Sequence, residues 1–137
     1  HFIETANVFS DIGVKLIYAN ATVIGLTDVD IEKISQVYIV ACGSAYHVGM
    51  AAQYVLEDLA RTPVCVELAS EFRYRRPILD KNALAIIVSQ SGETADSLAA
   101  FRKAKEHGVH ILGIVNIVGF FIDRGIDMPF AWRAALR

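Results

Sequence analysis

The sequence predicts a three-layer α/β/α domain with a mostly parallel sheet, and three observations support this fold class. Four apolar runs of strand length, rich in β-branched residues, alternate with helical segments, which is typical of parallel strands joined by right-handed crossovers. The 137 residues are about the length of one domain. Apolar residues make up 54% of the chain and charged residues 20%, which favours a folded core over disorder.

Each predicted strand is a continuous apolar run, as expected for strands that are buried on both faces. The four strands are predicted at residues 37–42, 64–68, 83–89 and 110–116. Helices are expected over about 45–60 and 93–106, and a short helix is expected from Ser70 until Pro77 stops it. The inner face of the first of these helices is expected to carry Val48, Ala52, Val55, Leu56 and Leu59.

The two ends of the chain differ from this regular pattern. Residues 1–36 are predicted to be an N-terminal helical linker segment, because apolar residues recur at helical spacing over about 3–18. Residues 120–137 form a divergent C-terminal end without a clean period, and no structure is predicted there. The regular domain is therefore expected over residues 37–119.

Composition argues against several classes of function. A formal charge of −2 gives no general attraction to nucleic acid or to an anionic membrane. No apolar run approaches the ~20 residues of a membrane helix. The two cysteines are too few for a disulfide scaffold, and the histidines are not spaced as ligands with acids or cysteines, so no metal site is expected. A soluble protein of the reducing cytoplasm is the resulting expectation.

Two loops lead from the carboxyl end of a predicted strand directly into a helix. They are residues 42–47, Cys-Gly-Ser-Ala-Tyr-His, and residues 89–94, Ser-Gln-Ser-Gly-Glu-Thr. Open α/β sheets bind ligands beyond the carboxyl ends of their strands, where the strand order reverses. If the spatial order is 2-1-3-4, the two loops face one crevice and both helix N-termini point toward it.

The second loop has the residue types of a phosphate cradle. Ser89, Ser91 and Thr94 supply hydroxyls, and Gln90 supplies an amide. Gly92 allows backbone N–H groups to face a ligand, and the positive end of the helix dipole favours an anion. The loop lacks lysine and does not match the Walker pattern, so we expect a phosphomonoester that is held rather than transferred. The same residues also make a good helix start with a serine cap, which is the alternative interpretation.

Other candidate residues have weaker support. Cys42 lies at a helix entry that favours thiolates, but no base other than His47 is evident, so a small buried packing role is preferred over a nucleophile. A cluster of Arg73, Arg75 and Arg76 could bind an acidic partner. A solvated or subunit-facing turn is preferred, because one short basic cluster in a slightly acidic chain is weak support for binding.

Three motifs in the same order carry a family resemblance. Residues 41–47, Ala-Cys-Gly-Ser-Ala-Tyr-His, residues 69–75, Ala-Ser-Glu-Phe-Arg-Tyr-Arg, and the loop that begins at Ser89 resemble the first sugar-isomerase (SIS) domain of the glucosamine-6-phosphate synthase family. The resemblance is clear over about 37–119. It implies a SIS-type fold with a flavodoxin-like strand order, and it implies that the chain is a fragment of the family's isomerase half.

The resemblance also implies a function. The family converts fructose 6-phosphate and glutamine-derived ammonia into glucosamine 6-phosphate, and isomerisation uses no metal or organic cofactor. One of these sugar phosphates is therefore the expected partner, and pairing through SIS domains implies a homodimer. A non-catalytic SIS module that senses a phosphosugar within a regulator is the alternative. By resemblance, the phosphate-holding positions are Ser89, Gln90, Ser91 and Thr94, and the sugar-contacting positions are Gly43 and Ser44.

The sequence departs from the family pattern at two places. Ala45 replaces a serine whose hydroxyl would reach the phosphate, and the lost hydrogen bond to a charged group costs about 1.5–3 kcal/mol, so weaker binding is expected. After Gly119 the resemblance ends, so a remnant that does not fold stably is a further alternative. The family's acid/base residues belong to its second half, so no catalytic residue is assigned here and the chain alone is expected to be inactive.

Overall fold

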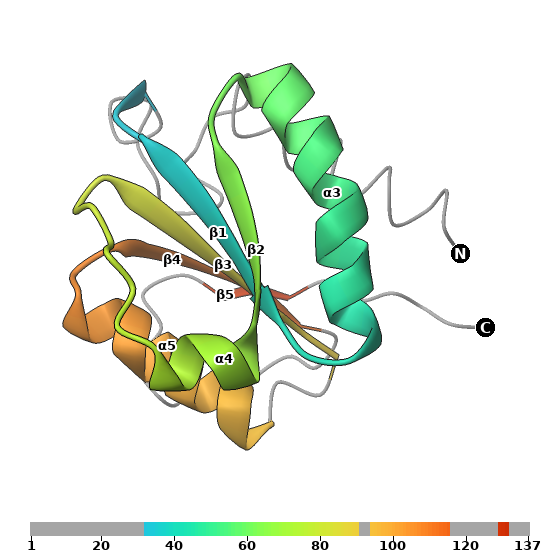
Figure 1. Ribbon diagram of the computed structural model, residues 1–137, viewed down its shortest axis with the longest axis vertical. Helices are drawn as coiled ribbons and strands as arrows, with labels where there is room; N and C mark the ends of the chain where they lie inside the picture. Colours follow the sequence, from blue (N-terminus) through green and yellow to red (C-terminus); the bar gives the residue numbers. More distant parts are fainter. Residues whose placement is uncertain (1–31, 91–93, 116–128, 132–137) are drawn as a thin grey trace.

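The computed structural model of the protein contains a parallel sheet with helices on both of its faces (Figure 1). The structure describes residues 32–90, 94–115 and 129–131, so the helix expected over about 3–18 lies outside the described residues. The elements are, in chain order, β1 (Gln36–Ala41), α3 (Ser44–Ala60), β2 (Val64–Leu68), α4 (Ala69–Tyr74), β3 (Ala83–Ser89), α5 (Ala95–Glu106), β4 (His110–Val115) and β5 (Pro129–Ala131).

The strand order reverses in the middle of the sheet. The order is β2-β1-β3-β4-β5, and every neighbouring pair is parallel. The chain goes outward from β1 to β2, returns to β3 on the other side of β1, and then continues to β4. The predicted α/β class, with its order 2-1-3-4, is confirmed. The pairing of β5 with β4 was not predicted, because three residues within an irregular segment give no periodic signal.

One face of the sheet is covered by α3 (Figure 1). Ile39 of β1 and Leu84 of β3 are fully buried there, in one apolar cluster with Leu56 of the helix. The helix lies close to the sheet because Gly49 has no side chain. A Cβ atom at this position would lie 2.9 Å from Ile39 Cγ2 and 3.0 Å from Val66 Cγ1.

The predicted inner face of α3 is confirmed at three of its five positions. Val55 is partly buried and is not a member of the apolar cluster. Ala52 and Leu56 are buried, and Val48 packs against the same cluster. Leu59 is 42% exposed, so its expected place on the inner face was wrong. It lies in the last turn, beyond Leu56, which is the last buried residue of the helix. The spacing alone does not show that the helix has passed its contact with the sheet.

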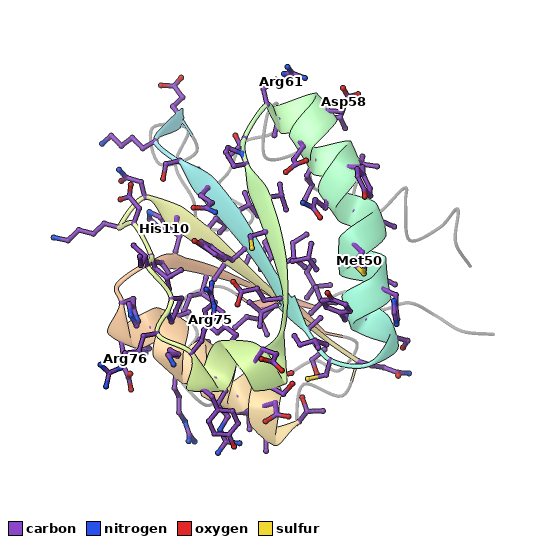
Figure 2. The ribbon with its side chains drawn as sticks, in the orientation of Figure 1. Met50, Asp58, Arg61, Arg75, Arg76 and His110 are labelled. Carbon is purple, nitrogen blue, oxygen red and sulfur yellow. The ribbon has the colours of Figure 1, made fainter. Side chains whose placement is uncertain are left out.

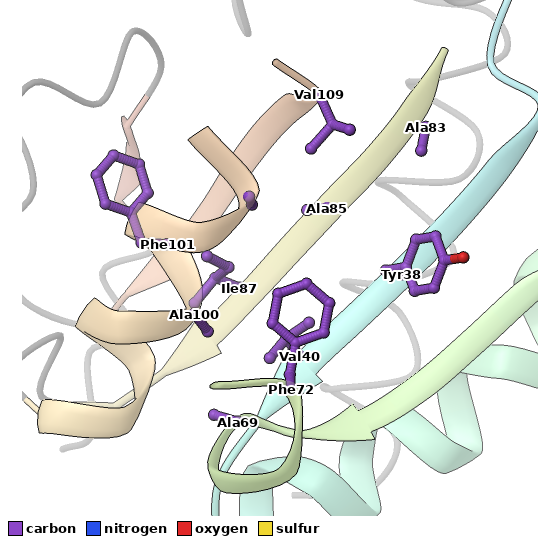
Figure 3. Packing of buried hydrophobic residues seen from close by; sticks show 11 residues of the cluster. Tyr38, Val40, Ala69, Phe72, Ala83, Ala85, Ile87, Ala100, Phe101 and Val109 are labelled. Carbon is purple, nitrogen blue, oxygen red and sulfur yellow. The ribbon is translucent and has the colours of Figure 1, made fainter. Parts of the chain in front are cut away.

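The other face of the sheet is covered by α4 and α5 (Figure 3). Val40 of β1 and Ile87 of β3 point toward this side, in one cluster with Phe72 of α4 and Ala100 and Phe101 of α5. Successive strand residues thus pack alternately into the two clusters, because side chains of a strand alternate between its faces. The predicted three layers are present. In the described part of the chain, no helix is long and apolar enough to cross a membrane.

Candidate functional site

Two strand-to-helix connections leave the same edge of the sheet. β1 and β3 are neighbours in parallel register, with Ala41 opposite Val88, so their carboxyl ends are level. The chain continues from β1 into α3 on one face, and from β3 it reaches α5 on the other face (Figure 1). The starts of α3 and α5 therefore flank the point where the strand order reverses, which is where open α/β sheets bind ligands.

Gly43 makes the turn from β1 into α3. Its φ of 56° and ψ of −132° lie in a region that residues with a side chain rarely adopt. Among the residues that the structure describes, none has an atom within 4 Å of a Cβ placed at Gly43, so none of them fills the space beside this turn. The first N–H groups of a helix have no acceptor within the helix, and here no N-cap side chain covers them. The turn can therefore present backbone N–H groups and the exposed Ser44 to an anion.

The predicted phosphate loop begins at the end of β3. Ser89 is the last residue of the strand and is 6% exposed, whereas Gln90 is exposed. By strand alternation, Ser89 lies on the same face as Ile87, the face that α5 covers. Ser91, like the other residues of 91–93, lies outside the described residues.

Thr94 is the N-cap of α5, where the sequence suggested a serine cap. Its φ of −63° and ψ of 133° are extended, and its carbonyl accepts a hydrogen bond from the Leu98 N–H at 3.0 Å. The Thr94 hydroxyl makes no capping bond to the backbone; it donates to Ser97 Oγ at 2.5 Å. The exposed hydroxyl at the helix start is thus joined to a serine that is 0% exposed.

Ser97 is a residue that the sequence reasoning did not select. It lies three residues after Thr94, outside the loop 89–94, and its spacing of three and four residues from Ala100 and Phe101 places it on the buried stripe of α5. A polar side chain on an otherwise apolar stripe was the signal that could have identified it.

Cys42 and His47 lie in different surroundings. Cys42 packs against the cluster on the α4 and α5 face, which is the contact expected of a small apolar side chain. His47 is exposed, and its ring lies edge-on to that of Tyr46 with the centroids 5.7 Å apart. The described part of the chain contains no group of His, Cys, Asp and Glu side chains that could hold a metal ion.

The arginine cluster is largely engaged within the domain. Arg73 forms an ion pair with Asp96 at 3.2 Å, which links α4 to the first turn of α5. Arg75 donates from Nε to Glu67 Oε2 at 2.7 Å. Arg76 is exposed (Figure 2). These pairs favour the interpretation of this segment as a solvated turn, because two of the three cations already have acidic partners.

Cys65 has a thiol whose pKa is raised by its surroundings. Burial raises the pKa of its thiol, and so do the charge of Glu67 and the hydrogen bond that the thiol donates to Glu67 Oε1 at 3.7 Å. A thiol with a raised pKa remains protonated at neutral pH, and the thiol form is a poor nucleophile. Burial likewise raises the pKa of Tyr38, whose hydroxyl donates to the Ile78 carbonyl at 3.2 Å.

These features define the structural class of the domain. A parallel sheet whose strand order reverses between two helix starts is an α/β domain of the kind in which ligands bind at the topological switch point. The model of the family described as "SIS domain" matches residues 30–132. The chain therefore belongs to the SIS-domain family, as its motifs predicted.

Curated relatives show which members of the SIS-domain family this chain is similar to. Two curated relatives, each named glutamine–fructose-6-phosphate aminotransferase (isomerizing), are 54% identical to this chain. The one from Clostridium tetani matches over 102 residues, 74% of this chain and 17% of its own length. The one from Clostridium acetobutylicum matches over 110 residues, 80% of this chain and 18% of its own length. The chain thus spans less than a fifth of these enzymes.

A solved structure of a related enzyme has the same fold as this chain. The C-terminal domain of glucosamine-fructose-6-phosphate aminotransferase from Francisella tularensis has a TM-score of 0.72 and 32% sequence identity to this chain. The similarity covers 98% of this chain and 39% of that one. The chain is thus homologous to part of the isomerase portion of an aminotransferase, and its resemblance to that enzyme is confirmed.

Replacing Gly43 with alanine tests the turn that shapes the site. Gly43→Ala is expected to lower the free energy of unfolding by about 1–3 kcal/mol, because a side chain is strained at this φ and ψ even though the added Cβ meets no atom of the described residues. Urea denaturation measures the change. Ser44→Ala, one residue later within α3, is the control and should change stability by less than about 0.5 kcal/mol. An equal effect of both substitutions would contradict the assigned turn.

Proposed function

We propose that this chain binds a phosphorylated hexose, fructose 6-phosphate or glucosamine 6-phosphate, at the sheet edge between the starts of α3 and α5. The observation that carries the proposal is the level pairing of β1 with β3, which brings the open Gly43 turn and the Thr94 helix start to one edge. The names of relatives that are 54% identical to the chain, which include fructose 6-phosphate, support this ligand class.

Each candidate residue has a proposed role in this site. The hydroxyl-rich loop holds the phosphate, with Gln90 adding amide donors and the α5 N-terminus adding its partial positive charge. The turn into α3 contacts the sugar. Neutral donors suit a phosphomonoester that must be bound and released intact, and no metal or cofactor enters the proposal. The loop residues are Ser89, Gln90, Ser91 and Thr94, and the turn residues are Gly43 and Ser44.

The parent enzyme is proposed to be a glucosamine-6-phosphate-forming aminotransferase, of which this chain supplies the first SIS domain. The proposed domain is residues 37–119, between the linker segment 1–36 and the divergent end 120–137. Isomerisation needs an acid/base placed at C1 and C2 of the sugar, and we assign none to this chain. The chain is therefore proposed to bind without turnover. A reducing cytoplasmic setting belongs to the same proposal, because Cys42 and Cys65 are both free.

A binding measurement tests the ligand. The full chain is titrated with glucosamine 6-phosphate and followed by thermal shift, where binding to the folded state must raise the melting temperature. Ser91→Ala should weaken the response, because it removes a hydroxyl from the anion. Ala45→Ser should strengthen it by roughly tenfold in affinity, because it restores a hydrogen bond to a charged group.

Controls separate this effect from a general one. Thr62→Ala removes a hydroxyl that donates to the Ala60 carbonyl at 3.1 Å, in the turn before β2, and it should leave the response unchanged. Fructose 6-phosphate with ammonia should give no glucosamine 6-phosphate in the presence of the chain alone. No thermal response to either sugar phosphate, or one that Ser91→Ala leaves intact, contradicts the site; product formation contradicts the absence of turnover.

A homodimer is a separate part of the proposal. The outer face of α3 exposes Met50 (42%; Figure 2) and Tyr54 (73%), which are one helical turn apart. This apolar surface would suit a second copy. Sedimentation velocity should show a dimer that Tyr54→Glu dissociates. Tyr74→Glu, at an equally exposed tyrosine of α4 (76%), is the matched control and should leave the dimer intact. A monomeric wild-type chain contradicts the dimer, and a dimer that resists Tyr54→Glu contradicts this surface.

A further inference from the structure

A pair of hydroxyl groups links the proposed phosphate loop to the core. Thr94 is exposed at the start of α5, and its Oγ1 lies 2.5 Å from Ser97 Oγ, which is fully buried. Of the residues that the structure describes, three buried ones carry a hydroxyl: Tyr38, Ser89 and Ser97. No buried side-chain oxygen or nitrogen lacks a partner there, so the hydroxyl of Ser97 is satisfied where it lies.

A serine is an unfavourable choice for this position on packing grounds alone. Its neighbours on the buried stripe, Ala100, Phe101 and Ala104, are apolar. Alanine has a higher helix propensity than serine and has no polar group to bury. Packing and helix formation would therefore both favour alanine at Ser97, and the hydroxyl contact with Thr94 is what serine adds.

We propose that Ser97 is a positioning residue that holds the Thr94 hydroxyl for the phosphate; this inference rests on the proposed function. A hydroxyl has one hydrogen and two acceptor lone pairs, and it rotates to suit its partners. In the structure Thr94 donates its hydrogen to Ser97. When an anion binds, Thr94 turns this hydrogen to the anion, and Ser97 donates its own hydrogen to Thr94 Oγ1. The hydrogen bond between the two hydroxyls is kept, with its direction reversed.

This arrangement has two consequences for affinity. The side chain of Thr94 is already fixed before the ligand arrives, so less rotamer entropy is lost on binding. The hydrogen bond that Thr94 accepts from Ser97 strengthens the one that it donates, since hydrogen bonds in a chain polarise one another. Without Ser97, the exposed Thr94 hydroxyl would bond to water and sample several orientations.

Titration calorimetry with glucosamine 6-phosphate tests the inference in four proteins: wild type, Ser97→Ala, Thr94→Val and the double variant. Ser97→Ala should bind about three- to tenfold more weakly, which corresponds to the loss of one ordinary hydrogen bond. Its melting temperature without ligand should not fall, because the exposed Thr94 can bond to water. In the Thr94→Val background, Ser97→Ala should have no further effect on affinity. Ser35→Ala removes an exposed hydroxyl bonded to Asp80 before β1, and it should bind as wild type does.

The outcomes separate this inference from the function on which it rests. If the wild type binds and Ser97→Ala binds equally well, the positioning role is wrong and the proposed function stands. If Ser97→Ala melts at a lower temperature without ligand or does not fold, its role is structural and the inference is wrong. Equal weakening by Ser97→Ala with and without the Thr94 hydroxyl also overturns it. If the wild type does not bind, both the proposed function and this inference fall.

Discussion

The parallel pairing of β1 with both β2 and β3 is the constraint from which the site follows. Because β1 lies between its two partners, the chain leaves it in one direction and returns past it in the other. Right-handed crossovers then send α3 over one face of the sheet and α5 over the opposite face. The starts of α3 and α5 consequently lie at the carboxyl ends of adjacent strands. The strand order alone produces this arrangement, whatever residues the loops contain.

The core holds this edge in place. Ile39 and Val40 point to opposite faces of β1, and Leu84 and Ile87 do the same in β3, with exposures of 0–1%. Burial of each such side chain contributes about 1.5–3 kcal/mol, and the close packing of Gly49 sets the distance of α3 from the sheet. The candidate binding groups of Ser44 and Thr94 are exposed by contrast. A rigid sheet thus presents polar groups at its rim, which suits binding sites on α/β folds.

Continuous apolar runs predict strands well, and two strands were predicted at their observed bounds, Val64–Leu68 and Ala83–Ser89. Features that depend on how the helices and strands pack together were harder to predict. The exposed Leu59 fits the helical spacing, and its exposure depends on where α3 passes the sheet. The short β5 pairs with β4 from far along the chain, which no local pattern indicates. The contact of Ser97 with Thr94 depends on which face of α5 is buried, together with the rotamer of a helix cap.

Family membership and the ligand positions follow from different observations. Membership of the SIS-domain family follows from the match over residues 30–132 and from relatives that are 54% identical. These relatives favour the isomerase half of an aminotransferase over a regulatory sensing module. The ligand positions rest on motifs and on geometry, and Ala45 is the one position in the first turn of α3 where the sequence is expected to weaken binding.

Backbone amide NMR shifts on addition of glucosamine 6-phosphate report where on the domain the ligand lies. If the ligand binds between the starts of α3 and α5, the largest changes fall at residues 43–46 and 94–98, on both sides of the point where the strand order reverses. Changes confined to the opposite edge of the sheet, at Thr62 and Asn82 before β2 and β3, would contradict it.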